Sequence, residues 1–153
     1  MSTYNIKIVS QTNAILLITV LLTLFMGSVF LLIPKGLHKG SAILVTILSM
    51  IIAYSLWQKF VTARTEWTID NNGIRLTWIK QFAFTNKKNI YLKWDEIENI
   101  GKGSDPNYYN LRIKLVTGQK LKFYHDTLTI KDDFKDFIRD LYQNFSDKNN
   151  LLQ

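Results

Sequence analysis

Two long apolar segments dominate the first part of the chain. Residues 14–33 contain no ionisable side chain, and residues 40–58 form a second uncharged segment after a short loop. A helix of about 20 residues rises roughly 30 Å, which matches the hydrocarbon core of a bilayer. The pattern predicts a two-helix transmembrane hairpin over residues 13–60. A hairpin leaves both chain ends on the same side of the membrane.

Capping and aromatic residues set the limits of the two predicted helices. Ser10, Thr12 and Asn13 offer N-cap oxygens before the first segment, while Pro34 and Gly36 end it. The second segment ends with aromatic side chains beside a lysine, as in the aromatic belt at the headgroup level: Tyr54, Trp57, Lys59 and Phe60. We expect the second helix to end near Phe60.

Small and hydroxyl-bearing residues recur at helical spacing in both segments: Thr19, Thr23, Gly27, Ala42, Thr46, Ser49 and Ala53. Such residues let helix backbones approach closely. We expect them to pack the hairpin on itself, and the alternative is an interface between two copies of the chain. Neither segment contains Asp, Glu, Lys, Arg or His, which argues against an ion pathway or proton relay within one copy.

After residue 60, apolar and polar residues alternate over short stretches, which is typical of half-buried strands. Residues 61–65 are expected to link these strands to the hairpin. Residues 66–70 and 74–78 flank Asn72-Gly73, a dipeptide that favours a type I′ turn because both central residues need positive φ. This turn pairs opposite residues as follows: Trp67 with Trp78, Ile69 with Leu76, and Asp70 with Arg75.

Further strands are predicted around a basic loop. Residues 82–84 and 90–92 bracket the loop 85–89, and residues 93–100 form the next strand. A Gly- and Pro-containing loop, residues 101–107, follows that strand. Residues 4–9 also alternate, and they are either a strand that joins the sheet or a segment at the membrane interface.

A last hairpin joins residues 111–115 to residues 120–123. Its loop, Val116-Thr117-Gly118, places the glycine in the left-handed conformation, so that Ile113 pairs with Leu121 and Leu111 with Phe123. Residues 129–132 then fit a capping box, and the apolar residues that follow line one helix face: Phe134, Phe137, Ile138, Leu141 and Phe145.

These elements predict a small antiparallel β-barrel or sandwich of about seven strands, with a C-terminal helix that closes its open end. The expected order along the chain is an N-terminal segment, the membrane hairpin, a linker, the β domain and a tail: residues 1–12, 13–60, 61–65, 66–146 and 147–153.

Residues 66–145 resemble a bacterial pleckstrin-homology-like (PH-like) domain. The resemblance rests on the first hairpin WTID-NNGI, the segment KWDEIENI, the late turn VTGQ and the terminal helix. Domains of this family commonly occur on one or two membrane helices, so the resemblance covers both parts of the chain. It implies a PH-like fold with a binding or scaffolding role and no catalytic residue.

The chain is basic, with a net charge of +7. Residues 1–60 contain no acidic residue, and their lysines flank the apolar segments, where long side chains reach the headgroups. This distribution explains the charge without a nucleic-acid partner. More basic residues flank the helix ends on the side of the two termini than on the side of the connecting loop, and flanking basic residues favour the cytoplasmic side. We therefore expect a cell-membrane protein with both termini and the β domain in the cytoplasm.

The sequence offers little chemistry for catalysis. It contains no cysteine, which excludes disulfides, a thiolate nucleophile and cysteine-bound zinc. His38 and His125 fall in different parts of the chain, and residues 101–104 lack the spacing of a phosphate-binding loop. Three acidic residues alternate with apolar ones on a predicted strand and are expected to face solvent: Asp95, Glu96 and Glu98. We expect no enzymatic activity, no cofactor and no metal site.

The last hairpin places like charges opposite each other, which is unfavourable. Lipid or partner binding is therefore assigned to its basic residues and to those of the preceding loop: Arg112, Lys114, Lys120, Lys122, Lys87 and Lys88. Three counterparts are open. They are Glu96 and Glu98 on the preceding strand, the anionic membrane leaflet at about 1 kcal/mol per basic side chain, or a protein partner.

Two functions follow from these features. The first is a membrane-anchored binding or scaffolding module that recruits anionic lipid headgroups or a protein partner at the cytoplasmic surface. The alternative is an immunity-type or accessory membrane protein that acts against a membrane-active toxin or within a larger membrane complex. A neighbouring toxin gene would favour the alternative.

Overall fold

The structure is a computed structural model that describes residues 1–32, 39–105, 108–126 and 132–151. Within these ranges, it describes only the backbone of residues 29–32, 39–40, 42, 104–105, 108 and 149–151. Pro34, Gly36, His38 and Thr129 lie outside the described residues, as does the side chain of Ala42. The chain forms two compact units, Ser10–Thr62 and a unit that joins Met1–Val9 to Ala63–Gln153.

The unit Ser10–Thr62 consists of helices. The helices α1 (Gln11–Leu32) and α2 (Lys39–Leu56) carry the apolar segments, and a short π-helix, η2 (Trp57–Val61), continues α2. Both long helices are apolar enough to cross a bilayer. Large apolar side chains are exposed along both of them, among them Leu22, Phe25 and Met50. Such surfaces are costly in water and favourable in lipid.

Hydrogen bonds join the two ends of this helical unit. The Ser10 hydroxyl oxygen accepts from the Asn13 N–H at 3.3 Å, as the predicted N-cap requires. The Asn13 amide donates to the Phe60 carbonyl at 2.9 Å, and the Ser10 N–H donates to the Val61 carbonyl at 2.9 Å. The start of α1 and the end of η2 are therefore held side by side.

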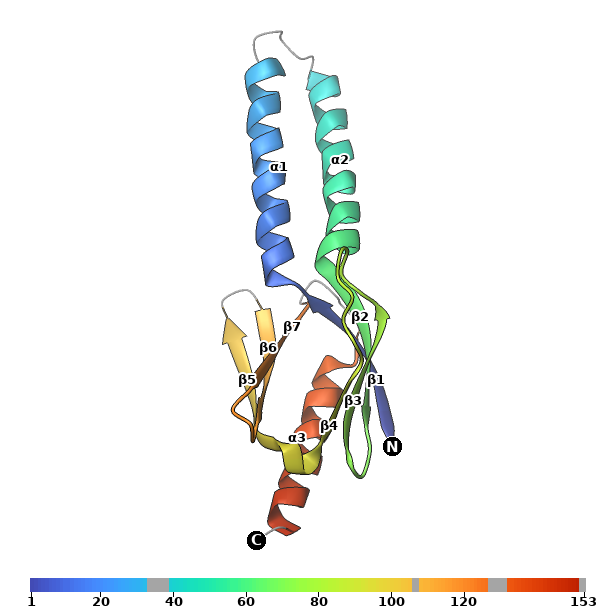
Figure 1. Ribbon diagram of the computed structural model, residues 1–153. Coiled ribbons are helices and arrows are strands. Elements are labelled where there is room, and N and C mark those ends of the chain that lie inside the picture. Colours follow the sequence, from blue (N-terminus) through green and yellow to red (C-terminus); the bar gives the residue numbers. More distant parts are fainter. Residues whose placement is uncertain (33–38, 106–107, 127–131, 152–153) are drawn as a thin grey trace. The chain divides into compact units, whose positions relative to one another are not determined.

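The other unit is built on one seven-stranded sheet with the order β4-β3-β2-β1-β7-β6-β5 (Figure 1). Its strands are β1 (Ser2–Val9), β2 (Thr62–Ile69), β3 (Gly73–Lys80), β4 (Ile90–Lys93), β5 (Ile97–Asp105), β6 (Tyr108–Leu115) and β7 (Lys120–His125). The N-terminal residues thus form the central strand. Residues 62–65, which the sequence analysis took as part of a linker, begin β2.

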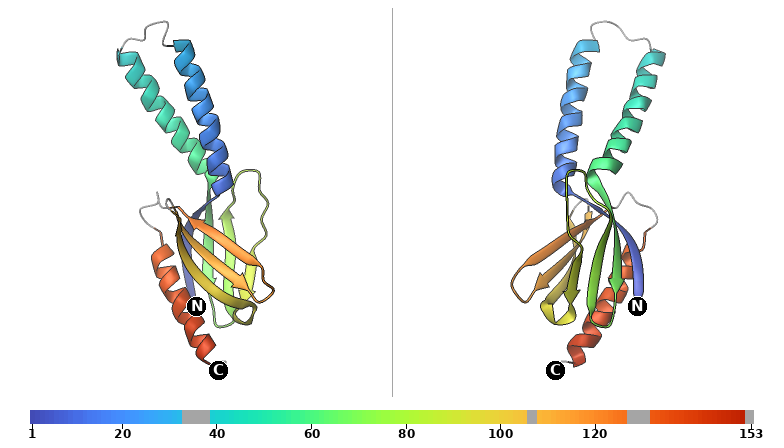
Figure 2. Two further views of the ribbon diagram at one scale, coloured as in Figure 1. Left: turned by 90° about the vertical axis from the view of Figure 1, so that its left-hand side faces the viewer. Right: turned by 45° about the vertical axis from the view of Figure 1, so that its right-hand side comes forward.

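The predicted antiparallel strands and C-terminal helix are confirmed, but the sheet is open and does not close into a barrel. Its edge strands β4 and β5 follow each other in the chain, separated only by the one-turn helix η3 (Trp94–Glu96). The helix η3 bends the chain between β4 and β5, whereas the sequence predicted one continuous strand over residues 93–100. The helix α3 (Phe134–Leu151) covers the opening of the curved sheet (Figure 2).

The β2–β3 hairpin has a different register from the predicted one. Trp67 pairs with Leu76, and Thr65 pairs with Trp78. The turn consists of Asn71 and Asn72, and the Asp70 side chain accepts from the N–H groups of Asn72 and Gly73, both at 2.8 Å. This side-chain cap stabilises a turn without positive φ and so overrides the Asn-Gly signal.

Gly73 has another role at the start of β3. A Cβ atom there would lie 2.1 Å from the Leu92 carbonyl oxygen of β4. The glycine therefore allows close approach of the neighbouring strand.

Two further strand predictions are corrected. Residues 82–84 are not a strand, because β3 ends at Lys80 and Phe84 has a φ of 61°. Residues 101–105, predicted as loop, belong to β5. The β6–β7 hairpin is confirmed, with Ile113 opposite Leu121 and Gly118 at a φ of 85°.

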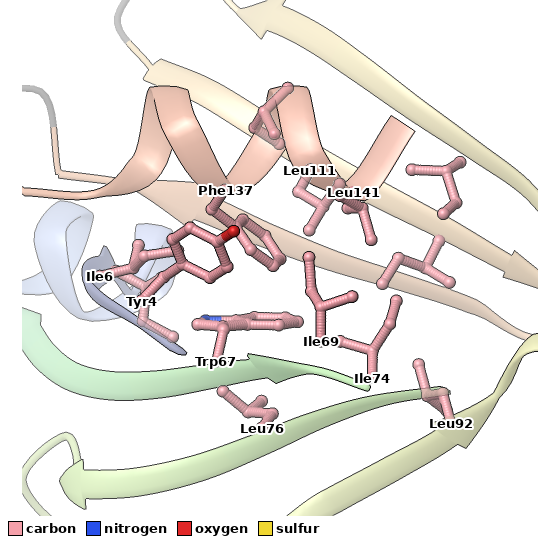
Figure 3. Close-up of a cluster of buried hydrophobic side chains, with 14 of the residues drawn as sticks. Tyr4, Ile6, Trp67, Ile69, Ile74, Leu76, Leu92, Leu111, Phe137 and Leu141 are labelled. Atoms are coloured by element: carbon pink, nitrogen blue, oxygen red, sulfur yellow. The ribbon is translucent and has the colours of Figure 1, made fainter. Parts of the chain in front are cut away.

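The core lies between the sheet and α3 (Figure 3). The Phe137 ring packs against the rings of Tyr4 and Trp67, at centroid distances of 5.5 and 5.0 Å. The predicted apolar face of α3 is confirmed, since Phe134, Phe137, Ile138 and Leu141 are buried and Phe145 packs against the core.

Acidic residues in α3 and just before it bind the part of β1 that is not paired with β7. Asp133 accepts from the Asn5 N–H at 2.7 Å, and its own N–H donates to the Asn5 carbonyl at 3.2 Å. The Tyr4 hydroxyl donates to Asp140. Burial raises the pKa of Tyr4, and the hydrogen bond from Tyr4 lowers the pKa of Asp140. These contacts fasten the central strand to the helix.

Candidate basic groove

The four basic residues of the β6–β7 hairpin lie together on its outer face and are called the ladder here: Arg112, Lys114, Lys120 and Lys122. Arg112 is directly opposite Lys122, and Lys114 is directly opposite Lys120, as the sequence predicts. They line an open groove of about 470 Å³ together with Asn99, Gly101 and Leu121. The apolar partners in the same strands, Leu111 and Ile113, point into the core. The alternation of the strands therefore gathers positive charge on one face.

Contacts within the unit position part of the ladder. Lys114 forms an ion pair with Glu98, one of the two acidic residues proposed as its counterpart. Glu96 instead accepts from the Lys93 N–H at 3.1 Å and caps η3. Lys122 Nζ lies 4.5 Å from the centroid of the Tyr124 ring. The side chain of Glu98, but not that of Glu96, thus supports the ladder in this structure.

Arg112 is held by two residues that the sequence analysis did not single out. Its Nε donates to the Asn110 side-chain oxygen at 2.8 Å. Its guanidinium lies across Gly103, where a Cβ atom would come within 2.8 Å of an Arg112 nitrogen. Gly103 lies opposite Asn110 and diagonally across from Arg112. A glycine inside a strand, next to the position that faces an arginine, is the signal that could have indicated this contact.

Lys87 and Lys88 do not line the groove. They lie in the segment that joins β3 to β4, residues 81–89, called the β3–β4 loop here. Lys87 Nζ is 5.4 Å from the ring centroids of both Trp78 and Phe82. The Trp78 indole N–H donates to the Lys88 carbonyl at 3.1 Å. The six basic residues therefore form two surfaces.

The strand register places these two surfaces toward opposite ends of the sheet unit. Val9, the last residue of β1, pairs with Tyr124 near the end of β7, whereas Lys114 and Lys120 adjoin the β6–β7 turn. The β3–β4 loop follows Lys80, which pairs with Arg64 near the start of β2. Because the chain passes to and from the helical unit at Val9 and Ala63, the loop lies at the end where these connections leave, and the ladder extends away from it.

Comparisons with protein-family models, curated proteins and solved structures find no match. The function has to be argued from the geometry of this chain.

A second groove lies within the helical unit, between α1 and α2. Its volume is about 610 Å³, and Thr46, Ser49 and Ala53 line it on α2. Among the described side chains, Thr19, Thr23 and Gly27 are not lining residues. The Thr19 and Thr23 hydroxyls donate to carbonyls of their own helix, each at 2.9 Å. The predicted small residues of α2 thus line this groove, whereas on α1 the small residue that lines it is Ser28, which the sequence analysis did not single out.

His125 is buried beside α3. Its Nε2 lies 2.7 Å from an Asp132 carboxylate oxygen, and its ring stacks on Phe134 with centroids 4.2 Å apart. Nothing in the sequence spacing indicated this pair. Among the described residues, no group of three or more His, Cys, Asp or Glu side chains could hold a metal ion. The pair fastens the end of β7 to the start of α3.

Proposed function

We propose that this protein is a membrane-anchored binding module of the PH-like class, in which the helical hairpin crosses the cell membrane twice and the ladder recruits an acidic segment of a protein partner. The observation that carries the proposal is the cross-strand pairing of like charges along an open groove. Like charges directly opposite each other are unfavourable, so a negative ligand would relieve the repulsion.

The position of the ladder favours a protein partner over membrane lipid. Lys114 and Lys120 adjoin the β6–β7 turn, at the end of the hairpin away from the Val9–Tyr124 pair. Within the sheet unit, this end is opposite to Val9 and Ala63, where the chain passes to and from the helices. Extended acidic segments suit a groove that follows two strands, since their carboxylates recur along the chain at the spacing of the strand residues.

Neutralising the ladder should weaken binding of an acidic peptide. We expect the change of Arg112, Lys114, Lys120 and Lys122 to Gln to lower the affinity for a labelled oligoglutamate peptide at low salt. The loss should be roughly 4- to 800-fold, because each of the four exposed ion pairs contributes about 0.2–1 kcal/mol. Fluorescence anisotropy on full-length protein in nanodiscs of zwitterionic lipid measures this. The effect should shrink as salt is added.

The matched control neutralises four basic residues elsewhere on the sheet unit: Arg75, Lys93, Lys135 and Lys148. This variant has the same net charge and should bind the peptide as the wild type does. Equal peptide affinity of the ladder variant and the wild type, together with a lowered melting temperature, would show that the ladder only balances Glu98. Binding that depends on anionic lipid in the disc, and not on the peptide, would indicate the leaflet as the ligand.

The proposed topology places both termini in the cytoplasm. Its support is that β1 and α3 belong to one folded unit, so the two ends of the chain lie on one side of the membrane. The chain has no cysteine, so an introduced cysteine is the only thiol in the protein that a maleimide can label. We expect a cysteine at Ser2 to resist an impermeant maleimide in intact cells and a cysteine at Gly36 to react. The opposite labelling pattern would reverse the orientation.

A further inference from the structure

Phe84 is the most exposed large apolar side chain among the described residues, with 97% of its surface accessible. Its φ of 61° is a left-handed conformation that bulky residues rarely adopt. The turn that contains it is closed by Thr85, whose N–H and hydroxyl donate to the Phe82 carbonyl at 3.2 and 2.9 Å. The loop therefore holds an aromatic ring out in solvent at a cost in conformational free energy.

The rest of the β3–β4 loop is fixed by contacts of its own. Phe82 is buried, and its ring centroid lies 5.9 Å from that of Trp78. The Gln81 side chain accepts from the Lys87 N–H at 2.7 Å and donates to the Lys87 carbonyl at 2.9 Å. Both flanks of Phe84 are thus anchored, and its outward position is built into the loop.

The loop lies near the point where the chain leaves the helical unit. Lys80 pairs with Arg64, and only Thr62 and Ala63 separate Arg64 from the last residue of η2, Val61. Three residue steps span at most about 11 Å of extended chain. The base of the β3–β4 loop is therefore only a few residue steps from the point where the chain leaves the helical unit.

The composition of this surface matches the membrane interface. Ile79 is exposed beside Lys80, and the loop itself adds Phe84, Lys87 and Lys88. Aromatic rings are enriched at the headgroup level, and lysines nearby attract anionic lipids. An exposed aromatic ring among lysines suits this environment better than bulk water.

We propose that the β3–β4 loop is a second membrane contact, in which Phe84 inserts at the headgroup–acyl boundary and the neighbouring lysines bind lipid phosphates. The occupant is the anionic bilayer that the helices of this chain enter. The inference rests on the membrane anchorage in the proposed function, but it does not involve the ladder. The contact would fix the sheet unit against the bilayer and so set the direction in which the groove faces.

The test uses single cysteines labelled with the environment-sensitive dye NBD in the full-length protein. The label at Asn86 leaves Phe84 in place and reports on the loop. Labels at Leu22, within α1, and at Val116, in the β6–β7 turn, serve as references. Each protein is placed in nanodiscs that contain phosphatidylglycerol and one of three additions: no quencher, lipids with a nitroxide near the headgroup, or lipids with a nitroxide at the acyl-chain centre.

We expect quenching and a blue-shifted emission at Asn86, and neither at Val116. Changing Phe84 to Gly in the Asn86-labelled protein should reduce the quenching. The same change should raise the melting temperature, because glycine adopts positive φ without strain. A ring that served packing would give a lower melting temperature.

The outcomes separate this inference from the proposed function. If a nitroxide at the acyl-chain centre quenches the label at Leu22 while Asn86 remains unquenched and solvent-like, the loop contact is overturned and the anchor stands. If Leu22 is not quenched, the membrane anchorage itself fails. If the label at Asn86 is quenched equally in the wild-type loop and in the Phe84→Gly variant, the ring does not insert and the inference is also overturned.

Discussion

Replacing Trp67 with alanine should unfold the sheet unit and leave the helical unit in the membrane. The side chain is 2% exposed, and its ring lies 5.0 Å from the ring of Phe123 and 5.0 Å from that of Phe137. Its indole N–H donates to the Thr65 hydroxyl at 2.9 Å, and that hydroxyl donates to the Ile6 carbonyl at 2.9 Å. Removal of such an aromatic costs roughly 3–5 kcal/mol, against a typical total stability of about 5–15 kcal/mol.

Trp78→Ala is the matched control in the same hairpin. Trp78 is only partly buried and packs at the margin of the core, where its indole N–H donates to the Lys88 carbonyl. We expect a smaller shift in the thermal unfolding curve, followed by near-UV circular dichroism in detergent. Equal destabilisation by the two changes would contradict the observed difference in burial between Trp67 and Trp78.

The sequence predicted most elements because each depended on a local pattern. Apolar length indicated α1 and α2, and helical periodicity indicated the buried face of α3, including Phe137 and Leu141. The β6–β7 register was predictable because Gly118 alone in its loop tolerates the positive φ that a three-residue turn requires. The ladder followed from that register.

Other features depended on competition between local signals. Asn72-Gly73 favoured one turn, but the Asp70 side chain caps a turn one residue earlier, which shifts each cross-strand partner by two residues. Gly73 is needed where β4 approaches. Likewise, Phe82 and Phe84 alternate around Ala83 as a strand would, yet one ring is buried and the other is exposed across a left-handed turn. The residue pattern alone does not show which of two competing local signals determines the structure.

Long-range pairing was the least predictable feature. The alternation of residues 4–9 indicated a strand, but nothing local shows that this strand pairs with β2, after the whole helical unit, and with β7, near the other end of the chain. The contacts of Asn5 with Asp133 and of Lys7 with Asp126 are separated even further in sequence. Such contacts arise only when the complete unit folds.

The position of β1 leads to the second large effect: residues 63–153 should not fold without residues 1–9. The strand buries Tyr4, Ile6, Ile8 and Val9 at the centre of the sheet. Burial of such side chains contributes about 1.5–3 kcal/mol each, so their joint loss is comparable to the whole stability of a small domain. The isolated fragment should show no cooperative thermal transition.

Supplying β1 in the same polypeptide should restore folding. The Ser10 N–H lies 2.9 Å from the Val61 carbonyl oxygen, so a short Gly/Ser turn can replace residues 11–60 and join β1 directly to β2. We expect this soluble chain to melt cooperatively by circular dichroism, and its Ile6→Asp variant to behave like the fragment, because a carboxylate would then be buried in the core. If residues 63–153 alone melted at the same temperature as the joined chain, β1 would be dispensable. If the prediction holds, the sheet unit cannot form until the chain has completed both membrane helices, because its central strand β1 precedes them and the neighbours of β1, β2 and β7, follow them.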